Sequence, residues 1–119
     1  MNGPLTIELH DGVPVGRLEG EVDISQTPFL RDKLHRAVES HHEGLVIDLT
    51  ETTYLDSSVV GLLFELAERL ATHQLRLAVV VPEGGLVERV LAIVDLGKVA
   101  SLHRTLDDAV AALRSPGEG

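Results

Sequence analysis

The residues best suited to chemistry are Asp56, Ser57 and Ser58, which follow an apolar stretch at 45–49 and a short polar loop. An acidic residue followed by hydroxyl residues is a common helix start, because the carboxylate accepts hydrogen bonds from unpaired backbone N–H groups. Ser57 would then lie in the first helical turn, where the positive end of the helix dipole favours an added negative charge. The pattern indicates a serine that can carry a phosphate. The spacing alone favours the simpler interpretation, a plain helix cap.

Other patterns for catalysis or ligand binding are missing from the sequence. Without cysteine, the chain has no disulfide, thiolate zinc site, iron–sulfur cluster or thiol nucleophile. The six histidines show no metal-ligand spacing with carboxylates, so we expect no metal and no cofactor. No Gly-x-Ser-x-Gly motif surrounds Ser57, and Gly84-Gly85 lacks the lysine of a phosphate-binding loop. We therefore expect a protein that is not an enzyme.

The composition is typical of one globular domain that binds other proteins. The chain has 119 residues, of which 44% are hydrophobic and 24% charged. Its net charge of −9 repels phosphate backbones and anionic lipids, and 3% aromatic residues leave no stacking platform for bases. We expect no nucleic-acid partner and no direct membrane contact. The sequence lacks a secretory signal and a long apolar run, which indicates a cytoplasmic protein.

The hydrophobic pattern predicts a hairpin followed by alternating helices and strands. Alternation at 5–9 and 13–18 around Asp11-Gly12 predicts the hairpin, after which 20–23 leaves the sheet. Thr27-Pro28 predicts the start of a first helix that Gly44 closes. The remaining predicted elements are strands at 45–49, 75–81 and 99–102 and helices at 57–71, 86–96 and 106–113.

This element order predicts an α/β fold with a mixed, mostly parallel sheet that opens with a hairpin. Right-handed crossovers connect parallel strands, and we expect about four helices, largely on one face of the sheet. The chain shows no internal repeat, linker or low-complexity segment, so we expect a single domain at 1–114 and a flexible tail at 115–119.

Three segments form a recognisable combination: Gly20-Glu21-Val22-Asp23, Val46-Ile47-Asp48-Leu49, and Tyr54-Leu55-Asp56-Ser57-Ser58. In this order, after an opening hairpin, they resemble the STAS domain family, and more closely its stand-alone bacterial anti-sigma factor antagonists. The resemblance covers essentially the whole chain. It implies a single STAS domain with a STAS-like fold.

The resemblance also implies a mechanism based on protein–protein interaction. Unphosphorylated members of this family bind an anti-sigma factor and free the sigma factor, and phosphorylated members let go. The anti-sigma factor is itself a serine kinase, and its implied target here is Ser57, with Ser58 as second choice. Asp56 precedes the acceptor, and Asp23 matches an acidic loop residue near it. The implied role is signal transduction in transcription regulation; no signal in the sequence indicates an oligomeric state.

One position departs from the family pattern. Val59 stands where the family usually has glycine, and Gly61 follows two residues later. We expect the branched side chain to narrow a partner's contact at the helix start. The predicted partner-binding set is Asp23, Asp56, Ser57, Ser58, Val59 and Gly61.

Two other classes of protein fit parts of the pattern. A non-phosphorylated STAS subunit, in a lipid-transport ABC complex or a stress-signalling assembly, would pack the helix after Ser57 permanently on its partner. A receiver domain shares the length and the alternation. It fits less well, because Asp48 lies inside its strand, no lysine follows Val81-Pro82, and the opening hairpin disagrees.

Overall fold

The opening hairpin forms as predicted from β1 (Leu5–His10) and β2 (Val13–Leu18). The computed structural model describes residues 4–40 and 43–114. The Glu19 N–H donates to the Pro4 carbonyl at 2.9 Å, which makes Pro4 and Glu19 a hydrogen-bonded pair. In an antiparallel ladder hydrogen-bonded and non-hydrogen-bonded pairs alternate, so every second pair of the hairpin, counted from Pro4 and Glu19, is hydrogen-bonded. Pro14 falls between two such pairs, where its missing N–H costs β1 no hydrogen bond.

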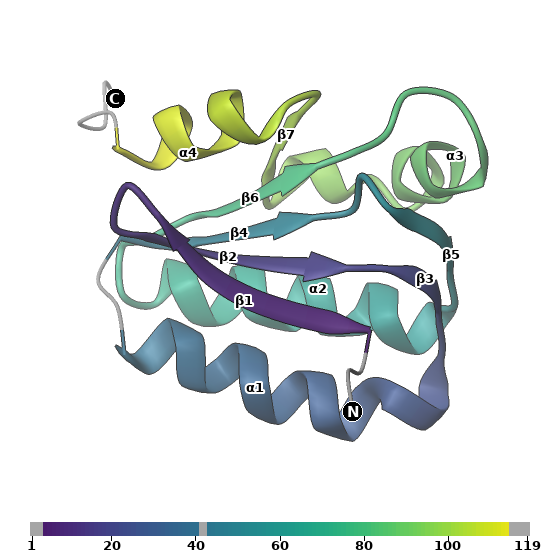
Figure 1. Ribbon diagram of the computed structural model, residues 1–119, viewed down its shortest axis with the longest axis horizontal. Helices are drawn as coiled ribbons and strands as arrows, with labels where there is room; N and C mark the ends of the chain where they lie inside the picture. The colour runs from purple at the N-terminus through teal and green to yellow at the C-terminus, as the bar shows by residue number, and fades with distance from the viewer. Residues whose placement is uncertain (1–3, 41–42, 115–119) are drawn as a thin grey trace.

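The main sheet has the strand order β1-β2-β4-β6-β7 (Figure 1). β4 (Leu45–Asp48), β6 (Leu77–Val80) and β7 (Ser101–His103) join β2 in parallel pairs, whereas β1 is antiparallel. All residues of β4 and β6 are buried, which explains why these segments are almost continuously apolar. The predicted mixed, mostly parallel sheet is confirmed.

Helices cover both faces of this sheet, unequally (Figure 1). α1 (Thr27–Ser40), α2 (Ser57–Ala71) and α3 (Leu86–Ile93) share a core cluster with alternate residues of β4 and β6, such as Ile47. α4 (Leu106–Arg114) packs on the opposite face, where Val46 lies. Among the described residues, three of the four α-helices thus serve one face, close to the prediction.

A second, two-stranded sheet was not predicted. β3 (Gly20–Val22) pairs in parallel with β5 (Thr52–Leu55), so segment 20–23 leaves the main sheet but does not become a loop. The Thr52 hydroxyl donates to the Leu18 carbonyl at 2.7 Å and ties this small sheet to the end of β2. Its strands are too short to show a clear period-2 pattern.

Two predicted helix boundaries need correction. A 3-10 turn, η1 (Ile24–Gln26), precedes α1, so Asp23 caps the start and the prediction of a Thr27 cap is wrong. α3 ends at Ile93, before Gly97, because Asp95 adopts a left-handed φ of 62° that leads into η2 (Leu96–Lys98). α1 is described as far as Ser40; segment 41–42, which the predicted helix includes on its way to Gly44, and the predicted tail at 115–119 lie outside the described residues.

Candidate functional site

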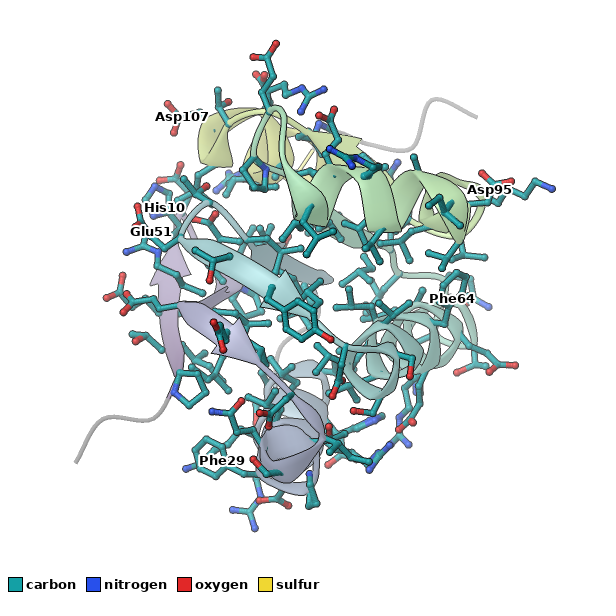
Figure 2. All side chains as sticks on the ribbon, turned by 90° about the vertical axis from the view of Figure 1, so that its right-hand side faces the viewer. His10, Phe29, Glu51, Phe64, Asp95 and Asp107 are labelled. Atoms are coloured by element: carbon teal, nitrogen blue, oxygen red, sulfur yellow. The ribbon has the colours of Figure 1, made fainter. Side chains whose placement is uncertain are left out.

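The candidate site lies where the two strands of the small sheet end. Parallel strands end at the same edge of a sheet, and Val22 of β3 pairs with Leu55 of β5. Asp23 follows β3 and Asp56 follows β5, so two acidic side chains from distant segments come to one end of the molecule. This is the end at which α2 begins, and Figure 2 faces it.

The Asp56 carboxylate links the two loops of the site, one after β3 at Asp23 and one between β5 and α2 at Asp56. One oxygen, Oδ1, accepts from the Ser58 N–H at 3.1 Å, the Val59 N–H at 3.2 Å and the Ser58 hydroxyl at 2.7 Å. The other, Oδ2, accepts from the Ile24 N–H of η1 at 2.7 Å. The prediction that Asp56 caps α2 is confirmed, and the same group also anchors the neighbouring turn.

These contacts lower the pKa of the Asp56 carboxyl below its usual value. The largest cause is the hydrogen bond from the Ser58 hydroxyl; the N–H groups of Val59, Ile24 and Ser58 act in the same direction, and partial desolvation opposes them. Asp56 is therefore ionised at neutral pH, and its charge is already shared among several donors.

Asp23 holds the second loop in a reciprocal cap. Its carboxylate accepts from the Ser25 N–H at 3.0 Å and the Ser25 hydroxyl at 2.6 Å. The Asp23 N–H in turn donates to Oε1 of Gln26 at 2.9 Å. Such a capping box fixes the backbone of η1 on both sides of Ile24.

The two candidate acceptor serines differ in their surroundings. Ser58 is partly buried, and its hydroxyl lies 2.7 Å from Asp56 Oδ1 and 3.0 Å from the Thr27 hydroxyl. Ser57 is exposed, and none of the hydrogen bonds within 4–40 and 43–114 uses its hydroxyl. Ser58 is thus part of the cap, and Ser57 is the hydroxyl that solvent and a second protein can reach.

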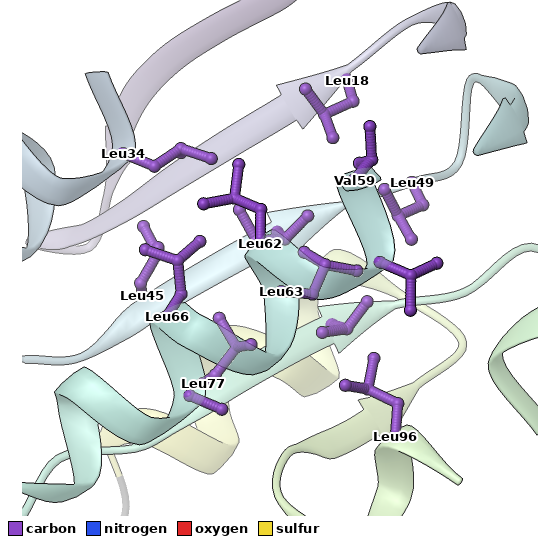
Figure 3. Packing of buried hydrophobic residues seen from close by; sticks show 14 of the residues in the cluster. Leu18, Leu34, Leu45, Leu49, Val59, Leu62, Leu63, Leu66, Leu77 and Leu96 are labelled. Carbon is purple, nitrogen blue, oxygen red and sulfur yellow. The ribbon is translucent and has the colours of Figure 1, made fainter. Parts of the chain in front are cut away.

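The structure contradicts the expected role of Val59. Only 1% of this residue is exposed, and Figure 3 shows its side chain in the core near Leu18 and Leu49. As the third residue of α2, it faces the sheet together with Leu62 and Leu63, so it cannot narrow a partner's contact. Gly61, in contrast, is exposed, and a Cβ there would meet open space.

The sequence did not indicate Ile24 or Thr27 as residues of this site. Ile24 is 68% exposed beside the two acidic residues, although isoleucine usually avoids solvent. Thr27 is buried and contacts the hydroxyl of Ser58 from α1. Ile24 stands between polar residues in a short segment, and this was the available signal that it is exposed. For Thr27 the sequence offered only a helix-start motif, which does not indicate a contact with Ser58.

Asp48 has a structural role. Its Oδ1 accepts from the N–H and the hydroxyl of Thr50 at 3.0 and 2.6 Å, and its Oδ2 lies 3.5 Å from Arg17 Nε. This buried carboxylate closes the turn after β4 and is not presented for phosphoryl transfer, unlike the acceptor of a receiver domain. In the described parts of the chain, no three acidic or histidine side chains are placed to hold a metal ion. No described helix is long and apolar enough to cross a bilayer.

The fold described above is that of a known protein family. The STAS domain family matches residues 4–109, so the chain belongs to the STAS domain family.

Particular members of the family extend this comparison. The anti-sigma-F factor antagonist RsfB of Mycobacterium tuberculosis is 28% identical over 110 residues, which are 92% of this chain and 88% of that protein. A solved anti-sigma factor antagonist from Mycobacterium paratuberculosis is 32% identical, with a TM-score of 0.84 over 93% of each chain. The phosphorylated Bacillus cell fate determinant SpoIIAA shares the fold, with a TM-score of 0.71, 22% identity, and coverage of 92% of this chain and 99% of that one.

Proposed function

We propose that this chain is an anti-sigma factor antagonist, which binds an anti-sigma factor and is released when that partner, a serine kinase, phosphorylates Ser57. The observation that carries the proposal is the exposed, unused hydroxyl of Ser57 at the start of α2, beside the Asp56 carboxylate. The relatives named anti-sigma factor antagonists support the same class of function. The chain would act by binding alone, without chemistry of its own.

The surroundings of Ser57 favour a change in binding over a change in fold. Asp56 already satisfies the N–H groups of Ser58 and Val59, so a phosphate on Ser57 would project into solvent with about −1.5 to −2 charges. Asp23 and Asp56 lie at the same end of the molecule, so the phosphate would add its negative charge beside two carboxylates. A partner covering this end would face added bulk, hydration and negative charge.

The proposed contact surface is centred on the two capped loops. It comprises the exposed Ile24 as an apolar anchor, Asp23 and Asp56 at its polar rim, Ser57, and the open face of Gly61. A loss of about 3 kcal/mol at this surface would weaken binding roughly 150-fold, enough for a switch. SpoIIAA exists in a phosphorylated form, which supports a phosphate being compatible with this fold.

Calorimetry with the anti-sigma factor of the same organism tests the contact. We expect Ser57→Glu to bind at least about 100-fold more weakly than the unchanged protein, and Ser57→Ala to bind normally. Ser40→Glu, at the far end of α1, adds the same charge elsewhere and should bind normally. Equal affinity of Ser57→Glu and Ser40→Glu would reject the proposed surface.

Incubation with the partner and ATP, followed by peptide mass spectrometry, tests the modification. Phosphate on Ser57 supports the proposal, and Ser57→Ala should then remain bound after ATP is added. Phosphate on neither Ser57 nor Ser58 would leave the alternative of a permanently bound STAS subunit. Co-purification with a transporter ATPase in place of a kinase would support that alternative.

A further inference from the structure

The two edges of the main sheet are protected to different degrees. β7 is an edge strand of three residues, and short edge strands limit pairing with other chains. β1 is an edge strand of six residues, and within the described residues it pairs with β2 alone. Figure 1 shows β1 at the front of the molecule. An edge of this length can accept a further strand.

The hydrogen-bond pattern shows which backbone groups β1 offers. Because Pro4–Glu19 is a hydrogen-bonded pair, residues 6, 8 and 10 direct their N–H and C=O groups toward β2. Leu5, Ile7 and Leu9 therefore direct theirs toward the free edge. Three residues with both groups facing outward make a complete ladder for another antiparallel strand.

The side chains of the same three residues form an apolar row. Leu5 packs against the core cluster under α1, and alternation places Ile7 and Leu9 on the same face. Ile7 is 37% exposed and Leu9 58% exposed, although both are large and apolar. Gly16, opposite Ile7 on β2, offers no side chain to cover it.

We propose that β1 is a homodimer interface, at which β1 of a second copy pairs with it in antiparallel fashion about a two-fold axis through Ile7. In this register Ile7 faces Ile7 of the second copy and Leu5 faces its Leu9, which continues the apolar row across the interface. Thr6 faces Glu8 of the second copy on the opposite face of the sheet. Every outward N–H and C=O of Leu5, Ile7 and Leu9 gains a partner.

Charge selects this register over the next one. A shift of the register by two residues would place Glu8 directly opposite Glu8 of the second copy. Like charges opposite each other destabilise strand pairs. The proposed register also places Pro4 opposite His10 of the second copy, in a pair that makes no hydrogen bonds, so the missing N–H of proline costs nothing.

The helices leave room for this arrangement. α1 lies over β2, where Leu34 approaches Gly16, and β2 would be separated from its copy by three strand spacings, about 14 Å. Packed helices need roughly 8–10 Å, so the two α1 helices would flank the apolar row without collision. The strand pair buries less than the roughly 1,600 Å² of a standard interface, so we expect a weak, concentration-dependent dimer.

Single-cysteine crosslinking tests the register, because the chain contains no native cysteine. Ile7→Cys would bring two Cα atoms to about 5.5 Å across the axis, within the usual disulfide range. We expect it to form a covalent dimer under mild oxidation much faster than Ile93→Cys, a matched variant at a 77% exposed site on α3. Faster crosslinking of Glu8→Cys than of Ile7→Cys would overturn the register.

Sedimentation equilibrium of the cysteine-free protein tests the dimer itself. We expect a reversible monomer–dimer equilibrium whose dissociation constant rises at least about tenfold in Ile7→Lys, since two lysines would then oppose each other. Ile93→Lys should leave the equilibrium unchanged. A protein that stays monomeric at several hundred micromolar, with Ile7→Cys no faster than Ile93→Cys, would overturn the proposal and leave the edge to a different partner.

Discussion

At the scale of single residues, Ser57 and Ser58 are adjacent and chemically identical, yet the fold uses them differently. Ser58→Ala removes the hydroxyl that donates to Asp56 and contacts Thr27, and we expect a loss of about 1 kcal/mol in unfolding free energy. Ser57→Ala removes an exposed hydroxyl and should change stability by less than about 0.5 kcal/mol. Urea titration of the two variants checks the difference; equal losses would contradict the division of roles.

The lowered pKa of Asp56 makes the stability of the folded protein depend on pH. Folding lowers this pKa, so the stabilisation that the Asp56 carboxylate provides is present above the unfolded pKa of about 3.9 and is lost as pH falls through the lower folded pKa. Asp56→Asn should therefore be less stable than the unchanged protein at pH 7, and the gap should shrink as pH falls below about 4. Thermal unfolding from pH 2 to 7 measures the gap. Asp107→Asn, an exposed change in the first turn of α4, is the control; a gap that stays constant to pH 2 would contradict the assignment.

At the scale of elements, α2 presents different faces to the core and to solvent. Val59→Gly removes a buried side chain and adds a flexible residue, and we expect a loss of roughly 3 kcal/mol in unfolding free energy. Gly61→Ala, two residues on, meets open space and should stabilise the helix by about 0.5–1 kcal/mol. If Gly61 lies in the partner contact, the same variant should bind the anti-sigma factor more weakly. Denaturant titration and calorimetry on both variants separate stability from binding.

Elements determined by residues close together in the sequence were predictable. The hairpin, the buried strands and the Asp56 cap each depend on neighbouring residues, and the sequence predicted them. The pairing of β3 with β5 joins short strands about thirty residues apart, and no local period marks it. Val59 was misjudged because the family pattern concerns the residue type, whereas the helical position decides the direction of the side chain.

At the scale of the whole molecule, one sheet face depends on α4 alone among the described helices. Val110 is buried against Val13, Val46 and Val80, and a carboxylate there would lose its water without gaining a partner. We expect Val110→Asp to cost roughly 3 kcal/mol or more, and Ala111→Asp, on the exposed side of the same turn, to cost far less. Circular dichroism during thermal unfolding compares the pair; similar melting temperatures would contradict this packing.

The hydrogen bond from the Ile24 N–H to the Asp56 carboxylate equips the molecule with a spectroscopic reporter. At 2.7 Å to a charged acceptor, this amide proton should resonate well downfield of most others, in a sparse region of a two-dimensional nitrogen–proton spectrum. A phosphate on Ser57, a partner over the two loops, or a proton on Asp56 would each alter that bond. A single cross-peak of an isotopically labelled sample would then follow the state of this end of the molecule in real time.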